Sequence, residues 1–225
     1  MRATLGYERR DERLHRGWLR SLLEKLGDKP HLIIVEAPDA RTRAELIAYR
    51  GKITFAELLH QGRFLRGSEA VKTLEQLEGE ARIAVARLRE TIVDWGPQLE
   101  LGIKGIDLQH RQLVNTLNRL YQGLLLGEPG PLLRGALSFL EEYSRLHFRS
   151  EERFFERHGY PRAEEHRRQH RWFIEKVREL REREALGETT LTLEVIDFLA
   201  EWVARHIAGS DRDYAEWIRR LGGQP

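Results

Sequence analysis

The sequence predicts a mainly α fold: an antiparallel up-down-up-down four-helix bundle preceded by a small, mostly helical N-terminal region. Three observations lead to this prediction. After Trp95, four long segments repeat apolar residues every three or four positions, as amphipathic helices do. Glycine and proline separate these segments by short connections, which favours antiparallel neighbours. The composition, 33% charged and 40% hydrophobic, is typical of a globular protein rich in such helices.

The N-terminal region, residues 1–93, carries weaker signals. Apolar spacing, an N-capping Asp39 and a capping-box pattern (TFAE) predict helices over residues 8–26, about 40–50, about 55–65, and from Ser68 to about Asp94. The segment HLIIVE at 31–36 is the best strand candidate. Because a lone strand is not stable, it needs a partner such as residues 51–55 or another chain.

The helix expected from Ser68 onward carries an apolar seam. From Val71 to Ile92, apolar residues recur every three or four positions, the pattern of about three heptads of coiled coil. Two readings stay open: a helix packed on its neighbours, or a homodimer or signalling helix through residues 68–94. Residues 1–93 contain no phosphate-binding loop, nucleophile elbow or zinc spacing, so this region stays unassigned, with dimerisation or signalling as its open roles.

The second region, residues 94–225, starts where Gly96 and Pro97 interrupt the chain. Its amphipathic segments predict helices over about 107–126, 131–158, 162–186 and 189–208, followed by a short helix over about 211–221. Glycine and proline close these segments, and Gly209 is expected to end the fourth helix.

Composition excludes several kinds of site and partner. Without cysteine there is no disulfide, thiolate nucleophile or iron–sulfur cluster, so any metal site needs histidine and carboxylate ligands. No apolar run approaches the roughly 20 residues of a membrane span, and the N-terminus lacks the apolar core of a secretory signal. With a net charge of only +2, we expect a cytoplasmic protein with neither a nucleic-acid nor a membrane partner.

Each bundle helix places at least one histidine beside apolar residues. The set comprises His110 on the first helix, His147 and Glu151 on the second, His166 and His170 on the third, and His206 and Asp211 at the end of the fourth. A lone buried histidine is usually structural, and a pair four residues apart is often a surface contact. Seven such groups buried together without metal, however, would suffer unpaired polar atoms and mutual repulsion. Imidazole with carboxylate suits Fe, Zn, Cu or Ni.

Seven side chains are too many for one ion. Two octahedral ions bridged by both carboxylates and by one oxygen would use all seven and leave a single vacant position. We expect an apolar wall around the vacancy, formed by Phe148, Trp202, Val203 and Ile207. Such a site suits end-on binding of a small molecule better than the positioning of a larger substrate.

Four stretches carry a resemblance to a known family: GIDLQH (105–110), YSRLHFRSEE (143–152), YPRAEEHRRQH (160–170) and WVARHIAGSD (202–211). They resemble the hemerythrin family, specifically bacteriohemerythrins, over about residues 94–221. The resemblance implies a hemerythrin-like bundle with two Fe ions (Fe2+/Fe3+) bridged by oxo or hydroxo, which binds dioxygen reversibly. It further implies one iron on His166, His170 and His206, the other on His110 and His147, and bridging by Glu151 and Asp211.

The expected function is therefore reversible dioxygen binding for transport, storage or sensing. In the sensing version, residues 1–93 would be the output or dimerisation element. The alternative is a di-iron enzyme acting on peroxide, O2 or nitric oxide; the binding protein is favoured, but the enzyme stays open. We expect Glu152 to support the site without binding metal and His158 to cap its helix. Phe155 stands where relatives often have Met.

Overall fold

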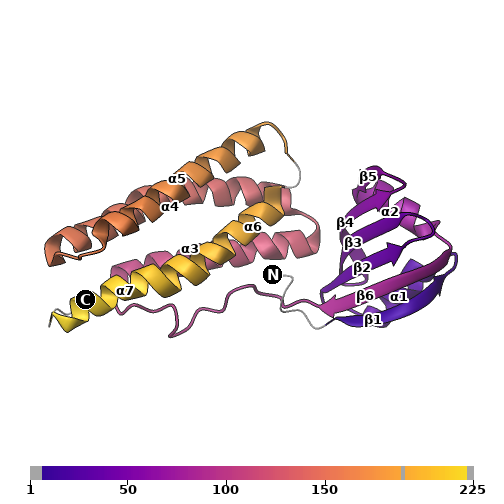
Figure 1. The fold of residues 1–225 in the computed structure, drawn as a ribbon, viewed down its shortest axis with the longest axis horizontal. Helices are drawn as coiled ribbons and strands as arrows, with labels where there is room; N and C mark the ends of the chain where they lie inside the picture. The colour runs from indigo at the N-terminus through magenta and orange to yellow at the C-terminus, as the bar shows by residue number, and fades with distance from the viewer. Residues whose placement is uncertain (1–6, 189–190, 222–225) are drawn as a thin grey trace. The chain divides into compact units, whose positions relative to one another are not determined.

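The computed structural model describes residues 7–188 and 191–221. The chain divides into two compact units. One comprises Met1–Glu90 with Gln122–Glu128, and the other comprises Thr91–Tyr121 with Pro129–Pro225. The N-terminal unit is built on a β-sheet, whereas the C-terminal unit is helical (Figure 1).

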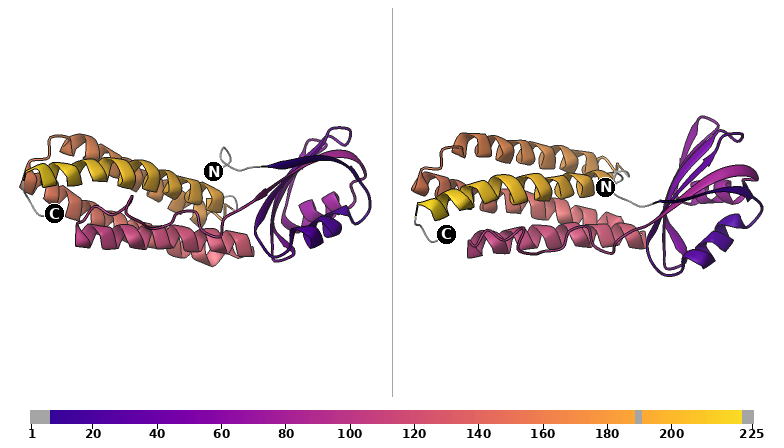
Figure 2. Two further views of the ribbon diagram at one scale, coloured as in Figure 1. Left: turned by 90° about the horizontal axis from the view of Figure 1, so that it is seen from below. Right: turned by 60° about the horizontal axis from the view of Figure 1, so that its bottom comes forward.

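The N-terminal unit, in its described part, is a six-stranded antiparallel sheet with both of its helices on one face (Figure 2). The strand order is β1-β6-β2-β3-β4-β5. The elements are β1 Glu8–Leu14, α1 Trp18–Leu26, β2 His31–Ala37, β3 Thr42–Tyr49, β4 Lys52–His60, β5 Arg63–Arg66, α2 Gly67–Glu75 and β6 Gly79–Arg87.

The prediction of a mostly helical N-terminal region is wrong. The helix expected over 8–26 is strand β1 followed by the shorter helix α1, and the helices expected over 40–50 and 55–65 are strands β3, β4 and β5. The strand predicted at 31–36 is confirmed as β2. It pairs with β3 and β6 rather than with residues 51–55.

The prediction of one long helix over residues 68–94 is wrong as well. Helix α2 ends at Glu75, and Gly79, with φ 113°, starts strand β6. In β6 the buried positions Ala81, Ile83 and Val85 alternate, which is the period of a strand and not of a coiled coil. The apolar seam therefore does not lie on one continuous helix. A homodimer through residues 68–94, one of the two open readings, stays a prediction.

Two hairpin turns explain why strands form where helical residues are common. Arg50 and Gly51 join β3 to β4 with φ of 52° and 70°, and Gln61 and Gly62 join β4 to β5 with φ of 49° and 80°. Two consecutive residues with positive φ make the two-residue turn that suits the twist of a hairpin. A glycine as the second of two turn residues is the signal in the sequence that marks these two hairpins.

The core of this unit lies between the sheet and its two helices. Inward residues of the strands, including Ile33, Leu46 and Leu58, are fully buried. They pack with Trp18 and Leu74 of the helices. The indole N–H of Trp18 donates to the carbonyl oxygen of Leu74 at 3.0 Å, which links α1 to α2. The sheet thus buries one face in the usual manner of an antiparallel sheet.

The C-terminal unit confirms the predicted four-helix bundle. Its long helical rods lie side by side, and consecutive rods run in opposite directions (Figures 1 and 2). The elements are α3 Lys104–Leu126, α4 Pro129–His158, α5 Ala163–Ala185, α6 Leu191–Trp202, the π-helix η2 Val203–Asp211, and α7 Arg212–Arg220. Within the described residues, no helix is both long and apolar enough to cross a membrane.

The fourth rod differs from its prediction. Gly209 was expected to end a helix, but the chain passes through it without a break, because α6, η2 and α7 follow one another directly. Gly209 lies within η2, where it has helical backbone hydrogen bonding rather than a helix stop. The short helix expected over about 211–221 is therefore the last part of a longer rod.

Candidate metal centre

The seven side chains predicted as metal ligands lie together in the interior of the helical unit. At most 2% of each residue's surface is exposed. They come from four elements: His110 from α3, His147 and Glu151 from α4, His166 and His170 from α5, and His206 and Asp211 from η2. So many buried polar side chains need partners in the interior of a protein.

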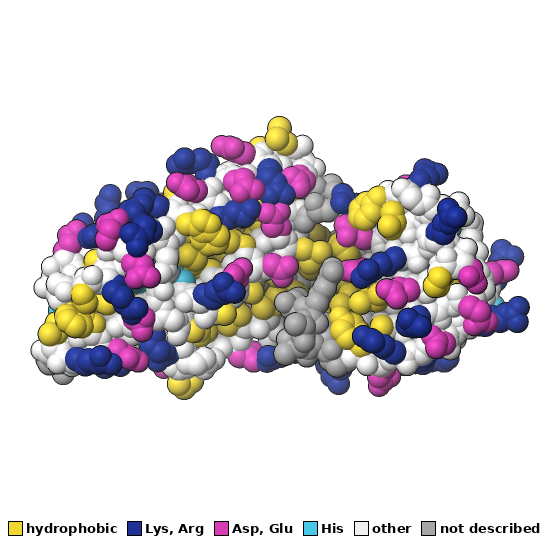
Figure 3. All heavy atoms as spheres, in the orientation of Figure 1, with side chains coloured by type: hydrophobic (Ala, Val, Ile, Leu, Met, Phe, Trp, Pro, Cys, Tyr) yellow, Lys and Arg dark blue, Asp and Glu magenta, His cyan; other side chains and the backbone are white. Residues whose placement is uncertain are grey.

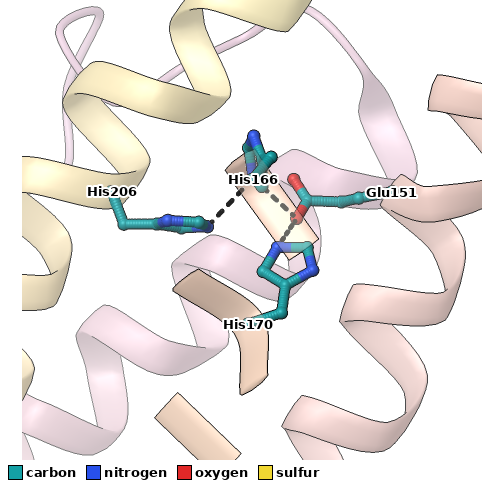
Figure 4. A group of neighbouring side chains, drawn as sticks. All are labelled: Glu151, His166, His170 and His206. Carbon is teal, nitrogen blue, oxygen red and sulfur yellow. Dashed lines mark hydrogen bonds and ion pairs between the residues drawn. The ribbon is translucent and has the colours of Figure 1, made fainter. Parts of the chain in front are cut away.

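These residues form two groups in which the donor atoms lie within 4.8 Å of one another. The first group contains Glu151, His166, His170 and His206, and the second contains His110, His147, Glu151 and Asp211. Glu151 belongs to both. In Figure 4 its carboxylate points toward the rings of His166 and His170, with the ring of His206 on the far side of His166.

Asp211 also faces both sets of histidines, with one oxygen toward each. Its Oδ1 lies 3.0 Å from Nε2 of His166 and 3.0 Å from Nε2 of His206. Its Oδ2 lies 3.2 Å from Nε2 of His110. Two carboxylates placed between two sets of imidazoles form the arrangement that a bridged pair of metal ions requires.

The π-helix η2 brings His206 and Asp211 to the same side of the fourth rod. In an α-helix five residues span about 1.4 turns, which would turn the two side chains to different faces. In a π-helix the backbone hydrogen bond joins residues five apart, so these positions lie one turn apart. The five-residue spacing is visible in the sequence, but the change of helix type is not.

The turn between α4 and α5 places the two i,i+4 pairs opposite each other. Helix α4 ends at His158, and Gly159, with φ 59°, takes the left-handed conformation common after helix ends. The backbone N–H of Tyr160 donates to the carbonyl oxygen of Phe155 at 3.1 Å. Helix α5 starts at Ala163, so the chain reverses within a few residues.

Glutamines orient two of the imidazoles. Nδ1 of His147 lies 2.9 Å from Oε1 of Gln109, and Nδ1 of His206 lies 2.6 Å from Oε1 of Gln169. Because an amide oxygen only accepts, Nδ1 is the protonated nitrogen of each ring. The lone pair of Nε2 is then directed into the site, as in histidines that bind metals.

A carboxylate orients a third imidazole. Nδ1 of His170 donates to Oε1 of Glu152 at 3.1 Å, and Glu152 belongs to neither ligand group. Burial lowers the pKa of His170, but hydrogen bonds to Glu151 and Glu152 outweigh it and raise this pKa to about 9. The ring must release that proton before its Nε2 can bind a metal ion.

The other resolved pKa values favour metal binding. Burial lowers the pKa of His147 to about 3, so the ring is neutral. Burial and Asp211 raise the pKa of Glu151, but His147 and His170 outweigh them and lower it to about 2. Burial likewise opposes ionisation of Asp211, yet its histidine neighbours, His206 first, hold its pKa well below the ordinary range. Both carboxylates are therefore anionic at neutral pH.

The positions of the buried polar atoms suit coordination of two metal ions better than hydrogen bonding among the side chains themselves. Both carboxylates are fully buried, and Nε2 atoms of histidines lie 3.0–3.2 Å from their oxygens, where a ring donates only if that nitrogen is protonated. The Nε2 atoms of His110 and His147 lie only 3.1 Å apart. Cations among these atoms would remove the cost of burying these anions. Nitrogen and carboxylate donors without thiolate fit Fe, Zn, Cu or Ni.

The four residues predicted as an apolar wall around the open position are all buried, and two of them stack on imidazoles. They are Phe148, Trp202, Val203 and Ile207, none more than 4% exposed. The ring of Phe148 stacks on His170, with centroids 3.9 Å apart and planes 8° apart. The indole of Trp202 stacks on His206 at 3.8 Å and 19°. These contacts keep apolar surface against the two rings.

Two further expectations concern the end of α4. Nδ1 of His158 lies 2.9 Å from the carbonyl oxygen of Phe154, so this ring bonds within the last turn of its helix as a cap does. Phe155 is buried, and its ring centroid lies 4.6 Å from that of His166. The residue type at this position therefore affects packing directly against an imidazole of the site.

Gln109 and Gln169 are the parts of the site that sequence reasoning missed. Each stands immediately before a predicted ligand in the chain, but its hydrogen bond goes to a histidine on a different helix. Spacing within one helix cannot predict such a contact. The available signal was weak: a polar side chain next to a predicted ligand in two of the four helices.

Comparison with known proteins covers the part of the chain that holds this site. A family model described as "Hemerythrin HHE cation binding domain" matches residues 101–218, which include all seven side chains. A bacteriohemerythrin of Stenotrophomonas maltophilia is 34% identical over 131 residues, 56% of this chain and 80% of that protein. A bacteriohemerythrin of Clostridium acetobutylicum is 32% identical over 127 residues, 54% of this chain and 98% of that protein. A hemerythrin-like protein of Naegleria gruberi is 26% identical over 121 residues, 54% of this chain and 89% of that protein.

Proposed function

The chain belongs to the hemerythrin family, as its motifs suggested, and on this premise we propose that it binds dioxygen reversibly at a non-haem di-iron centre. The proposed ligands are His166, His170 and His206 for one iron, His110 and His147 for the other, and Glu151 and Asp211 as bridges. The observation that supports this most is the placement of both carboxylates, each facing both groups of histidines. The second iron, with fewer histidines, would keep the open position.

When bound, the iron pair supplies dioxygen with an open coordination position and two reducing electrons. The chain's own residues prepare that chemistry. Gln109 and Gln169 hold the protons on Nδ1 of His147 and His206, so that their Nε2 lone pairs face the metals. Phe148 and Trp202 stack on His170 and His206, ligands proposed for the three-histidine iron, and exclude water from that side of the centre.

The test is a visible absorption spectrum of the iron-loaded full chain, recorded under nitrogen, under air, and under nitrogen again. Reversible binding predicts a band that appears with dioxygen and disappears when it is removed, with one dioxygen taken up per two irons. The same titration on the zinc-loaded chain is the control, since zinc has no redox chemistry and should give no band. Two bound irons without a reversible band would contradict the proposal.

A di-iron enzyme acting on peroxide, dioxygen or nitric oxide is the alternative for the same residues. It differs in consuming its substrate. Steady disappearance of peroxide or nitric oxide at a rate proportional to the iron-loaded protein would favour the enzyme. Uptake of dioxygen that stops at the stoichiometric amount would favour the binding protein.

Oxygen sensing is a second candidate, and the separate N-terminal unit is the observation that favours it. Residues 7–90 form a sheet with its own core and hold none of the seven proposed ligands, so this part has a role apart from metal binding. If it is an output element, the oxygenated and deoxygenated full chains should differ in oligomeric state or hydrodynamic radius. Identical sedimentation profiles in the two states would argue for a carrier.

A further inference from the structure

A surface pocket lies beside the metal centre, between α5 and the rod formed by α6 and η2. Its volume is about 600 Å³, and its lining includes the rings of Trp172, Trp202 and His206. Two basic and two acidic side chains also line it: Arg168, Arg205, Glu165 and Glu201. This volume is in the range of small-molecule sites. Figure 3 shows hydrophobic side chains gathered over the space between α5 and α6, with acidic and basic side chains around them.

Three of the lining rings form a nearly parallel stack from the solvent to the metal centre. Trp172 is 51% exposed, although exposed indoles of this size are uncommon away from binding surfaces. Its ring centroid lies 6.3 Å from that of the buried Trp202, with planes 21° apart. Trp202 in turn stacks on His206 at 3.8 Å and 19°. A continuous series of π-systems thus joins the pocket to a proposed iron ligand.

We propose that this pocket binds the isoalloxazine ring of a reduced flavin, and that the stack Trp172–Trp202–His206 carries its electrons to the ferric centre. The inference rests on the proposed di-iron function, because a dioxygen-binding iron pair that oxidises needs a route back to the ferrous state. Of the seven proposed ligands, all at most 2% exposed, His206 is the one that lines the pocket. An electron from the pocket can therefore reach the centre through His206, and the stack joins that ring through Trp202 to the half-exposed face of Trp172.

The geometry of the pocket favours a flavin over other reductants. It is concave and of small-molecule size, whereas a protein electron donor would use a larger and flatter surface. The half-exposed face of Trp172 offers a stacking surface for a planar aromatic ring. Arg168 can bind the phosphate of flavin mononucleotide, whereas Arg205 is paired with Glu201 at 3.1 Å. A nicotinamide cofactor would deliver a hydride, for which the stack has no acceptor, while a reduced flavin can deliver single electrons.

The redox reaction balances with the reduced flavin as the only co-reactant. One reduced flavin gives up two electrons, one after the other, and two protons. Each of the two ferric ions takes one electron and becomes ferrous, the flavin becomes oxidised, and the protons pass to water at the pocket. The two indoles and the imidazole are unchanged at the end, since they only provide the path.

Binding of flavin to the pocket is tested separately from electron transfer, by an equilibrium titration. Oxidised flavin mononucleotide and riboflavin are titrated into the iron-loaded full chain, and the dissociation constant is taken from quenching of flavin fluorescence. Trp172→Leu should weaken binding about tenfold, the value expected for loss of an aromatic stacking contact, while Trp172→Phe retains most of it. Trp95→Leu is the matched control, because Trp95 lies partly exposed outside the pocket, with its ring against Arg111. Equal affinity in Trp172→Leu and Trp95→Leu would overturn the docking site.

The electron-transfer half is tested by anaerobic stopped-flow mixing of the ferric protein with photoreduced flavin mononucleotide, following the loss of ferric absorption. At saturating flavin, reduction should be several-fold slower in Trp172→Leu than in the unchanged chain, in Trp172→Phe or in Trp95→Leu. An unchanged saturating rate would overturn the relay even if docking is confirmed. Weaker binding by riboflavin than by the mononucleotide would assign the difference to the phosphate and Arg168, and equal binding would remove Arg168 from the proposal.

Failure of this inference can be distinguished from failure of the proposed function. The reversible dioxygen band reports the function and does not depend on flavin, whereas flavin fluorescence reports docking and does not depend on dioxygen. A reversible band with no flavin binding would reject the inference alone. Flavin binding and reduction without a reversible band would reject the carrier function and keep the electron path.

Discussion

The carboxylates of Glu151 and Asp211 illustrate how single residues of this centre depend on a bound cation. Both are fully buried and anionic, and both face two sets of imidazoles, which donate to them only where Nε2 is protonated. Buried anions that lack a full set of donors or a cation destabilise a folded chain. Metal ions reverse that effect. We therefore expect these two side chains to destabilise the metal-free protein and to stabilise the metal-loaded protein.

Two adjacent glutamates on α4 give a matched test of ligand against supporting residue. Glu151→Gln removes the charge shared by both groups and should abolish binding of both irons. Glu152→Gln leaves the ligand set intact and weakens only the hydrogen bond to His170, so iron affinity should fall about tenfold to a hundredfold. Iron per chain after chelator competition measures both effects. Equal iron retention by the two variants would contradict the assignment of Glu151 as the bridge.

The glutamine beside His206 should matter for metal binding although it is not a proposed ligand. Gln169→Leu removes the oxygen that accepts from Nδ1 of His206 and from Oγ of Ser210. Iron affinity should fall by about tenfold or more, since the ring loses its fixed orientation and tautomer. Gln112→Leu, on the exposed side of α3, is the control and should bind iron normally. Similar affinities in the two variants would show that Gln169 does not position the imidazole.

At the scale of elements, the fourth rod joins metal binding to the packing of the bundle. Its π-helix η2 carries His206 and Asp211, and α7 continues directly from it with Tyr214 and Ile218 fully buried. Charge pairs hold the other end of this rod to α5. Glu194 of α6 accepts hydrogen bonds from Lys176 and Arg183 at 2.7–2.9 Å. The rod is therefore held by buried packing at its C-terminal end and by charge pairs at its N-terminal end.

The contacts of Glu194 predict a stability difference that depends on pH. Hydrogen bonds to Arg183 and Lys176 lower its pKa from 4.5 to about 2. A lowered carboxyl pKa means that the stabilisation is complete above pH 4.5 and is lost as pH falls toward about 2. The metal-free Glu194→Gln variant should thus unfold at a lower temperature than the unchanged chain at neutral pH. Thermal unfolding followed by circular dichroism across this range should show the difference shrinking.

A control for the same experiment replaces a glutamate whose partner lies on its own helix. Glu142 pairs with Arg145 three residues later on α4, and both side chains are more than half exposed. Exposed pairs of this kind contribute about 0.2–1 kcal/mol or less. Glu142→Gln should therefore have a smaller effect than Glu194→Gln at neutral pH. Equal effects would mean that the link between α5 and α6 adds nothing beyond a surface ion pair.

At the scale of the whole molecule, the chain contains two folded units with separate cores. The core of the first lies between the sheet and helices α1 and α2. The second buries the proposed metal ligands inside the bundle, and none of them comes from residues 7–90. A chain with two cores does not have to unfold in one cooperative step.

Calorimetry of the full chain should therefore show two unfolding transitions, of which iron shifts one. A ligand that binds only the folded state raises the unfolding temperature of the unit that holds it. The transition of the helical unit should move upward on iron loading, while that of the sheet unit stays in place. A fragment of residues 91–225 should reproduce the iron-sensitive transition. A single transition, or an equal shift of both, would mean that the two units unfold together.

The sequence allowed reliable prediction where the evidence is local. His147 with Glu151, and His166 with His170, are pairs one helical turn apart, and the Gly-Tyr-Pro break between them marks the turn. The same reasoning failed for residues 1–93. Ala81, Ile83 and Val85 fit a strand, yet Val71, Leu74, Ala81, Ala84 and Leu88 also fit a helix. Helix-forming residues such as Ala, Glu, Leu and Arg then favoured the wrong alternative, because strand formation depends on partner strands.

The sequence by itself determined the four amphipathic helices, the seven candidate ligands and the family, because side-chain periodicity and motif spacing are properties of short segments. Only the tertiary structure decided the six-stranded sheet in the described N-terminal unit, the π-helical turn that aligns Asp211 with His206, and the glutamines that orient imidazoles on other helices. Each of these depends on hydrogen bonds or packing between segments, or on a change of backbone register. Residue types along one segment do not encode such contacts.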